Sequence, residues 1–211
     1  MITSSIILML ITFNRKLPVT MARTMWSPGI LWACGVKLVV EGKENVDINT
    51  PHIFVSNHCS YLDIPVLFRV IPSNLYFIAK KEIKWIPFIG QYMMATGMLF
   101  VNRSNRHKAI QSLKKAAILI HNGRSVLMFP EGTRSRDGKL AAFKKGPFHL
   151  ALQADVSTVP IGVTGTGKVL GPSQWRVKPG VVTVKIGKSL TREDYPELSQ
   201  LQEKSWESVA D

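Results

Sequence analysis

The sequence predicts an α/β fold, with a largely parallel central sheet flanked by helices and an apolar segment before it. Two observations support this fold class. The expected strands are apolar along their whole length, which is typical of strands buried on both faces of a sheet. Segments with helical spacing of apolar residues separate these strands, as in successive β–α–β units. The chain has 211 residues and no Pro-, Gly- or Ser-rich linker, so one domain is expected from residue 36 onward.

The elements follow one another as short apolar runs and longer helical patterns. Strands are expected at 37–40, 53–56, 75–78, 98–101, 126–129, 159–163 and 181–186. Helices are expected at 60–68, 106–121, 147–154 and 191–208. Ser60 has the side chain of a helix N-cap, and Gly123 lies just beyond the end of the second predicted helix.

The amino-terminal segment, residues 1–35, is unusually apolar for a soluble domain. Its first apolar run ends at residue 13 and is too short to cross a bilayer, which takes about 20 residues in a helix. A second apolar stretch, 26–40, is interrupted by Pro28 and Gly29. We expect two helices that lie against one leaflet, with nearby basic residues at the headgroups. The alternative is a helical hairpin buried against the domain core.

The charge balance is strongly basic, with 27 Lys and Arg against 14 Asp and Glu and a formal net charge of +13. Such a charge attracts polyanions, either an anionic membrane surface or nucleic acid. The basic residues are spread along the chain without a tail or zinc-finger spacing, so a nucleic-acid partner is not expected. The two cysteines, Cys34 and Cys59, form no CxxC pattern and indicate a reducing compartment.

Polar clusters follow three of the predicted strands directly. They are Asn57-His58, Asn102-Arg103 and Pro130-Glu131-Gly132. In open α/β sheets, sites lie beyond the carboxyl ends of the strands. The sequence therefore predicts that these clusters gather at one edge of the sheet and form its functional site.

His58 and Asp63 are the candidate base and its partner. In one regular helix a spacing of five leaves the side chains about 140° apart, so they would not meet. They can meet if His58 lies in the turn before the helix and Asp63 in its first turns. Asp63 would then hold one imidazole nitrogen and leave the other as a base. A capping pair without catalytic function is the alternative, and Cys59 as a thiolate nucleophile is a less favoured one.

The segment around Glu131 is the candidate anion site. Gly132 permits close backbone approach, and Arg134 offers a planar donor to a phosphate, with Lys144 nearby in the chain. Glu131 could hold arginines in position or accept a hydrogen bond from a substrate hydroxyl. The five histidines have no metal-ligand spacing, so no metal is expected.

These motifs together resemble the glycerolipid acyltransferase family, specifically its 1-acylglycerol-3-phosphate acyltransferases (lysophosphatidate acyltransferases). The resemblance spans about residues 36–190. Four blocks occur in the family's order: Asn57-His58 with Asp63; Gly97 through Phe100-Val101-Asn102-Arg103, with Asn102 where many members have Asp; Phe129-Pro130-Glu131-Gly132-Thr133-Arg134-Ser135; and Val159-Pro160-Ile161.

The resemblance implies a direct acyl transfer. His58, oriented by Asp63, would deprotonate the 2-hydroxyl of lysophosphatidate, which attacks the thioester of acyl-CoA or acyl carrier protein to give phosphatidic acid. Arg103 and Arg134 would bind the phosphate, and Glu131 and Gly132 would position the glycerol. The resemblance implies no metal and no cofactor. The full set of residues expected to contact substrate is Asn57, Arg103, Glu131, Gly132, Thr133, Arg134 and Lys144.

The resemblance also implies an organisation and a location. Residues 1–35 would dock on a membrane, and residues 36–211 would form the catalytic domain. We expect the cytoplasmic face of a bacterial inner membrane. Three alternatives stay open: a related acyltransferase that uses another lysophospholipid or glycerol-3-phosphate, a non-catalytic membrane-binding homologue, and a nucleic-acid-binding basic protein.

Overall fold

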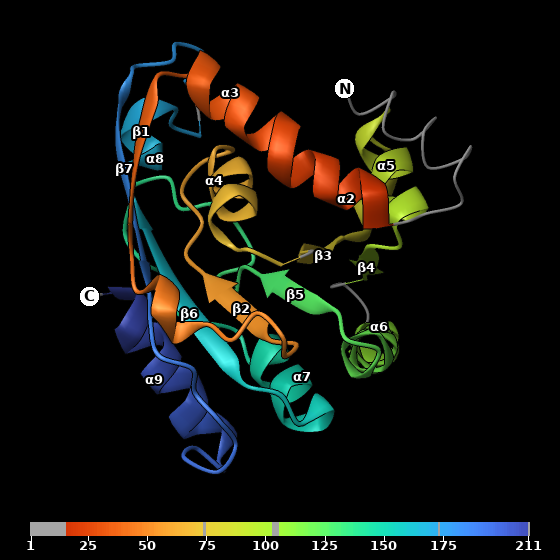
Figure 1. Cartoon of the computed structure of the whole chain (residues 1–211). Coiled ribbons are helices and arrows are strands. Elements are labelled where there is room, and N and C mark those ends of the chain that lie inside the picture. Colours follow the sequence, from red (N-terminus) through yellow and green to blue (C-terminus); the bar gives the residue numbers. More distant parts are fainter. Residues whose placement is uncertain (1–15, 74, 103–105, 173, 211) are drawn as a thin grey trace.

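The computed structural model describes residues 16–73, 75–102, 106–172 and 174–210 (Figure 1). The first apolar run of the amino-terminal segment and Arg103 lie outside these residues.

The described residues form a seven-stranded sheet with strand order β1-β7-β6-β2-β5-β3-β4. All neighbouring strands are parallel except β6 and β7, which are antiparallel. This confirms the predicted α/β fold with a largely parallel sheet. The strands are β1 (Val36–Glu41), β2 (Ile53–Ser56), β3 (Leu75–Lys80), β4 (Leu99–Val101), β5 (Ser125–Met128), β6 (Thr158–Thr164) and β7 (Gly180–Ile186).

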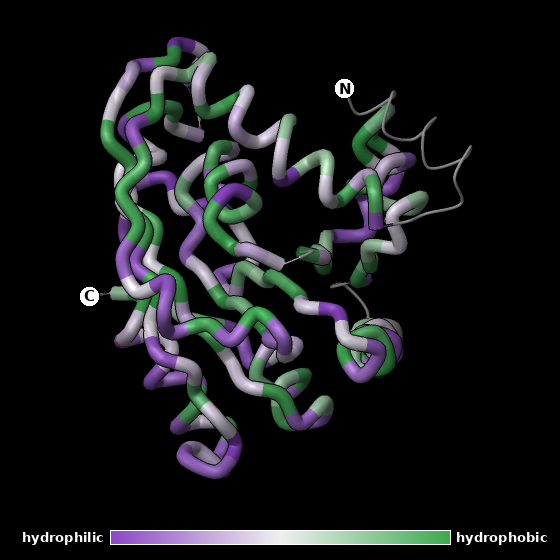
Figure 2. Tube along the Cα trace, in the orientation of Figure 1, coloured by the Kyte–Doolittle hydropathy of each residue, from purple (hydrophilic) through white to green (hydrophobic). Residues whose placement is uncertain are grey.

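Helices cover both faces of the sheet, with α3 and α4 on one side and α6, α7 and α9 on the other (Figure 1). The larger helices of the domain are α4 (Asp63–Val70), α5 (Ile89–Thr96), α6 (Arg106–His121), α7 (Gly146–Ala154) and α9 (Leu198–Ala210). Phe54 on β2, Leu127 on β5 and Ile161 on β6 are fully buried between the two layers. The central strands are mostly hydrophobic and the loop before α9 mostly hydrophilic (Figure 2).

Two predicted helices begin later than expected. Helix α4 starts at Asp63 and not at Ser60. The Ser60 hydroxyl accepts a hydrogen bond from the N–H of Leu62 and donates one to Leu170 O. These two bonds keep the residues before Asp63 in a turn. Helix α9 starts at Leu198. Thr191 and Asp194 instead close a local turn through their side chains, and Pro196 disfavours helical backbone in the residue before it.

The described part of the amino-terminal segment is one continuous helical rod. It consists of α2 (Lys16–Met21), the π-helical η1 (Ala22–Trp26) and α3 (Ser27–Ala33). The buried Ser27 hydroxyl donates to Pro65 O on α4, and the phenol of Tyr92 on α5 donates to Pro18 O at 3.0 Å. One face of the rod is thus packed on the domain, while Trp32 is 84% exposed. Among the described residues, no helix is both long and apolar enough to span a membrane.

The apolar stretch 26–40 is not one element. The rod ends at Ala33, Gly35 turns the chain with a φ of 63°, and β1 begins at Val36. A Cβ at residue 35 would lie 2.8 Å from Pro179, so this tight turn requires glycine.

Candidate active site

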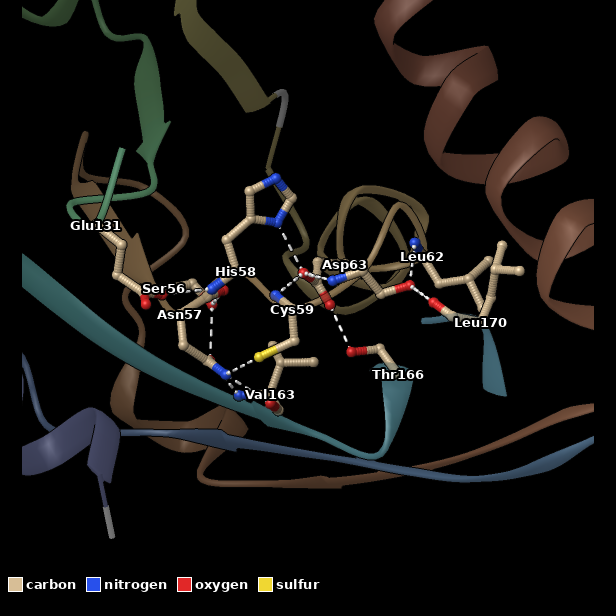
Figure 3. Close-up of polar contacts among 11 residues, drawn as sticks. Ser56, Asn57, His58, Cys59, Leu62, Asp63, Glu131, Val163, Thr166 and Leu170 are labelled. Atoms are coloured by element: carbon tan, nitrogen blue, oxygen red, sulfur yellow. Dashed lines mark hydrogen bonds and ion pairs between the residues drawn. The ribbon is translucent and has the colours of Figure 1, made fainter. Parts of the chain in front are cut away.

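The site lies where three neighbouring parallel strands, β5, β2 and β6, reach the same edge of the sheet. Three segments meet there: the turn after β2, the loop after β5 and the start of α8 (Thr166–Val169), which follows β6 (Figure 3). Two of the three clusters predicted from strand ends therefore come together. The third follows β4, the edge strand, and its Arg103 is outside the described residues.

Asp63 and His58 meet as their spacing allows, because His58 lies in the turn before α4 and Asp63 is the first residue of that helix. Asp63 Oδ2 is 2.7 Å from His58 Nδ1 and also accepts hydrogen bonds from the backbone N–H groups of Cys59 and Ser60. Backbone N–H groups can only donate, so Oδ2 acts as an acceptor and the shared proton belongs to Nδ1. In the neutral ring, Nε2 is then the unprotonated, basic nitrogen.

His58 is fixed by its backbone as well as by its ring. Its N–H donates to Glu131 Oε1 at 2.8 Å, and its carbonyl accepts from the N–H of Ser135 at 2.8 Å. The imidazole stacks on the ring of Phe129, with centroids 4.0 Å apart and planes inclined by 14°. Nε2 has no hydrogen-bond partner within the described part of the chain, and the side chain is 16% exposed. The remaining nitrogen is therefore available to a ligand.

Glu131 is buried and joins two loops. Its second carboxylate oxygen, Oε2, accepts from the N–H of Ala141 at 3.0 Å. It forms no ion pair with Arg134 in the described structure. Each carboxylate oxygen of Glu131 thus accepts a hydrogen bond from a backbone N–H group, and one of these groups belongs to His58. A hydrogen bond from substrate to Glu131 stays a prediction.

Asn57 ties the end of β2 to β6. Its Oδ1 accepts from the N–H of Val163 and its Nδ2 donates to Val163 O, both at 2.8 Å (Figure 3). The side-chain amide thus continues the ladder between the two strands by one more pair. Contact between Asn57 and substrate stays a prediction.

Arg134 lies against residues 57–62, the turn between β2 and α4 that holds His58, which we call the catalytic turn. Its guanidinium carbon is 3.6 Å from the ring centroid of Tyr61, in a cation–π contact. Its Nη1 is buried and donates to no group among the described residues. Because a buried donor without a partner is costly, this nitrogen marks a place where an anionic ligand would be stabilised.

The other predicted substrate residues are placed as follows. Gly132 has a φ of 79°, which favours glycine, and its N–H donates to Phe129 O. The Lys144 N–H donates to Pro130 O, while its side chain is exposed, as is that of Thr133. Their contacts with substrate stay predictions.

Thr166 is a site residue that the sequence analysis missed. It is fully buried, and its hydroxyl donates to Asp63 Oδ1 at 2.6 Å. The carboxylate thus receives hydrogen bonds on both oxygens and is fixed in place. The signal that could have revealed Thr166 is its position just beyond β6, at the same edge as His58. Phe129 was assigned to a strand, whereas β5 ends at Met128 and Phe129 supports the imidazole.

Cys59 does not have the surroundings of a nucleophile. Burial, followed by the negative charge of Asp63, raises the pKa of the thiol. A raised pKa keeps the sulfur in its weakly nucleophilic thiol form near neutral pH. This argues against the thiolate nucleophile that the sequence left as the less favoured alternative.

The arrangement can remove a proton from a hydroxyl group beside an anion. An oriented imidazole supplies the base, and the unpartnered Arg134 nitrogen supplies the positive charge. The described residues contain no group of three His, Cys, Asp or Glu side chains that could hold a metal.

Comparison with known proteins relates this arrangement to acyltransferases. The family model described as Acyltransferase matches residues 37–164. A 1-acyl-sn-glycerol-3-phosphate acyltransferase of Cocos nucifera is 38% identical over 169 residues, covering 80% of this chain and 54% of that protein. The human protein named 1-acyl-sn-glycerol-3-phosphate acyltransferase alpha is 33% identical over 176 residues, covering 81% of this chain and 62% of its own.

A solved structure agrees with these relatives. The crystal structure of the 1-acyl-sn-glycerophosphate (LPA) acyltransferase PlsC from Thermotoga maritima matches with a TM-score of 0.81 and 29% identity, covering 93% of this chain and 78% of that one. The chain spans between half and two thirds of the length of the curated relatives named above. The matched region holds His58, Asp63, Glu131 and Arg134, and the chain therefore belongs to the Acyltransferase family.

Proposed function

We propose that this chain transfers an acyl group from a thioester, acyl-CoA or acyl carrier protein, to the 2-hydroxyl of 1-acylglycerol-3-phosphate, forming phosphatidic acid. The proposal rests chiefly on the His58–Asp63 pair, whose geometry occupies Nδ1 and leaves Nε2 without a partner among the described residues and reachable. The names of relatives that cover about 80% of this chain support the choice of acceptor.

The proposed reaction proceeds without an acyl-enzyme. His58 Nε2 takes the proton of the acceptor hydroxyl as its oxygen attacks the thioester carbonyl carbon. The tetrahedral intermediate collapses, the C–S bond breaks, and the leaving thiolate takes the proton back from the imidazolium. Asp63 stabilises that imidazolium through Nδ1. The Arg134 guanidinium binds the phosphate of the acceptor, for which its unpartnered Nη1 is suited.

The proposed partners follow from the same chemistry. The thioester supplies the driving force, so no cofactor is invoked. Acceptor and product are lipids, and the net charge of +13 favours an anionic membrane surface. We propose that residues 1–35 contribute to attachment there and that residues 36–211 carry the chemistry. The cytoplasmic face of a bacterial inner membrane stays a prediction.

The test is thioester consumption by detergent-purified protein, with wild type beside His58→Ala. We expect turnover with 1-acylglycerol-3-phosphate and a loss of at least about a hundredfold in the variant, because general-base catalysis typically contributes about 10²- to 10⁴-fold. A matched thermal melt shows whether the variant folds. Substantial turnover by a folded His58→Ala protein would remove His58 from the role of base.

The acceptor is tested in the same assay. Glycerol-3-phosphate and lysophosphatidylcholine replace 1-acylglycerol-3-phosphate at equal concentration. Preference for either would keep the chemistry and reassign the substrate. A lack of turnover with every acceptor and donor would favour the non-catalytic alternative.

A further inference from the structure

The segment between β3 and α5 exposes an unusual run of apolar side chains. Five consecutive apolar residues, from Trp85 to Ile89, are all exposed to solvent, with Trp85 at 81% and Phe88 at 59%. We call residues 84–89 the β3–α5 tip. Runs of exposed apolar residues are rare in a soluble domain unless they bind something.

The β3–α5 tip has a fixed conformation. The N–H of Ile89 donates to Pro87 O at 2.8 Å, the N–H of Gly90 to Ile86 O at 2.9 Å, and the N–H of Phe88 to the side chain of Gln91 at 2.6 Å. A Cβ at residue 90 would lie 2.1 Å from Lys84 O, so the two ends of the tip are in close contact. The outward display of its side chains is therefore part of the fold.

Phe88 adopts a strained backbone conformation within the tip. Its φ of 64° and ψ of −46°, with the hydrogen bond from Ile89 to Pro87, form a γ-turn of the rare positive-φ kind. A bulky residue is unfavourable at such a position. Strain of this sort persists where the surroundings fix it and is concentrated at functional positions.

The tip lies at the same edge of the sheet as the catalytic turn. Strands β2, β5 and β3 are parallel neighbours, and the 3-10 turn η3 (Lys81–Trp85) leaves the carboxyl end of β3 as His58 follows that of β2. Figure 1 shows α5, which follows the tip, beside the α2 end of the amino-terminal rod. The Tyr92–Pro18 hydrogen bond joins the two. The tip, the rod and the active site thus share one region of the molecule.

The charge of the segment indicates which surface it contacts. Residues 80–91 contain three lysines and one glutamate, and the ammonium of Lys84 lies 5.8 Å from the ring centroid of Trp85. Exposed tryptophan and phenylalanine beside lysine are typical of the headgroup region of bilayers, where the rings are partly buried and the ammonium groups meet anionic lipid.

We propose that the β3–α5 tip is a second membrane-attachment point, which inserts Trp85 and Phe88 into the headgroup region of an anionic bilayer. Attachment at this edge would bring the catalytic turn to the surface where lipid acceptors lie. This inference rests on the proposed function, which identifies the acceptor as a lipid. It assigns membrane binding to residues outside the amino-terminal segment.

The test is co-sedimentation of the full chain with phosphatidylcholine vesicles that contain about 30% phosphatidylglycerol, which gives the surface a negative potential. The double variant Trp85→Ser/Phe88→Gly removes both rings and relieves the strain at residue 88, so it folds at least as well at that position. We expect its vesicle partition coefficient to fall at least tenfold. Ile118→Ser is the matched control. Ile118 is 61% exposed near the end of α6, which runs back from the carboxyl edge of the sheet, and this variant should bind as wild type does.

The outcomes separate the inference from the proposed function. Unchanged vesicle binding by the folded double variant would overturn the attachment point, whatever the activity. Loss of affinity for acyl carrier protein, or loss of self-association, with vesicle binding intact would overturn it too and assign the tip to a protein partner. Wild-type turnover is measured in detergent in the same preparation, and its absence would count against the proposed function alone.

Discussion

The hydroxyl of Thr166 controls the geometry of the base without touching substrate. It provides the hydrogen bond to Asp63 Oδ1, while His58, Cys59 and Ser60 all donate to Oδ2. Thr166→Val keeps the shape of the side chain and removes this bond. We expect kcat to fall about tenfold with little change in KM, since a hydrogen bond to a charged group contributes about 1.5–3 kcal/mol and 1.4 kcal/mol is a factor of ten.

The control for Thr166 is a serine. Thr166→Ser keeps the hydroxyl and loses the methyl group, so steady-state kinetics should show most of kcat restored. Equal losses in both variants would mean that Thr166 acts through packing and not through Asp63.

Tyr61 has a comparable role for Arg134. The phenol ring lies under the guanidinium at 3.6 Å and holds the buried Nη1 in place. Tyr61→Leu should raise KM for the phosphate-bearing acceptor about two- to thirtyfold, because a cation–π contact contributes about 0.5–2 kcal/mol and 1.4 kcal/mol is a factor of ten. Tyr61→Phe keeps the ring and should leave KM within twofold. The same increase with Phe as with Leu would assign the effect to the hydroxyl.

Asn57 joins β2 to β6, two of the strands that carry the site. Its amide pairs with both backbone groups of Val163 and so fixes β2 against β6 beyond their last regular pair. Asn57→Ala leaves the N–H of Val163 without this acceptor. We expect the free energy of unfolding, measured by urea denaturation, to fall by about 1–3 kcal/mol.

Stability and activity should change together in this variant. The tie lies next to His58 in the chain, so kcat should also fall. A stable Asn57→Ala protein with reduced affinity for the acceptor alone would instead support the predicted contact between Asn57 and substrate.

The elements and the site differ in how far they could be predicted from sequence. Apolar runs and strand-end polar residues depend on local sequence, so the seven strands and the His58–Asp63 pair were predictable. The partner of Asp63 Oδ1 is 103 residues away, and His58, the backbone partner of Glu131 Oε1, is 73 residues away. Such contacts depend on strand order and register, which no local spacing reveals. The start of α4 at Asp63 depends on the hydrogen bond from Ser60 to Leu170, which is 110 residues away.

In the molecule as a whole, the net charge and the apolar β3–α5 tip both contribute to association with a membrane. The net charge of +13 attracts anionic lipid over a range that salt limits to about 10 Å at 0.1 M. The apolar β3–α5 tip would bind by burial, which salt does not screen. We therefore expect partition of the protein into the same phosphatidylglycerol-containing vesicles to weaken severalfold between low salt and about 0.5 M salt. Above that concentration, partition should level off above zero.

The double variant Trp85→Ser/Phe88→Gly separates the two contributions in that titration. Its binding should lose the salt-resistant part and keep the salt-dependent part, because Lys80, Lys81 and Lys84 are unchanged. Co-sedimentation across the salt series measures both. A salt-resistant part of equal size in the variant and in wild type would place apolar insertion elsewhere in the chain, whereas its loss would show that charge brings the molecule to the surface and the tip holds it there.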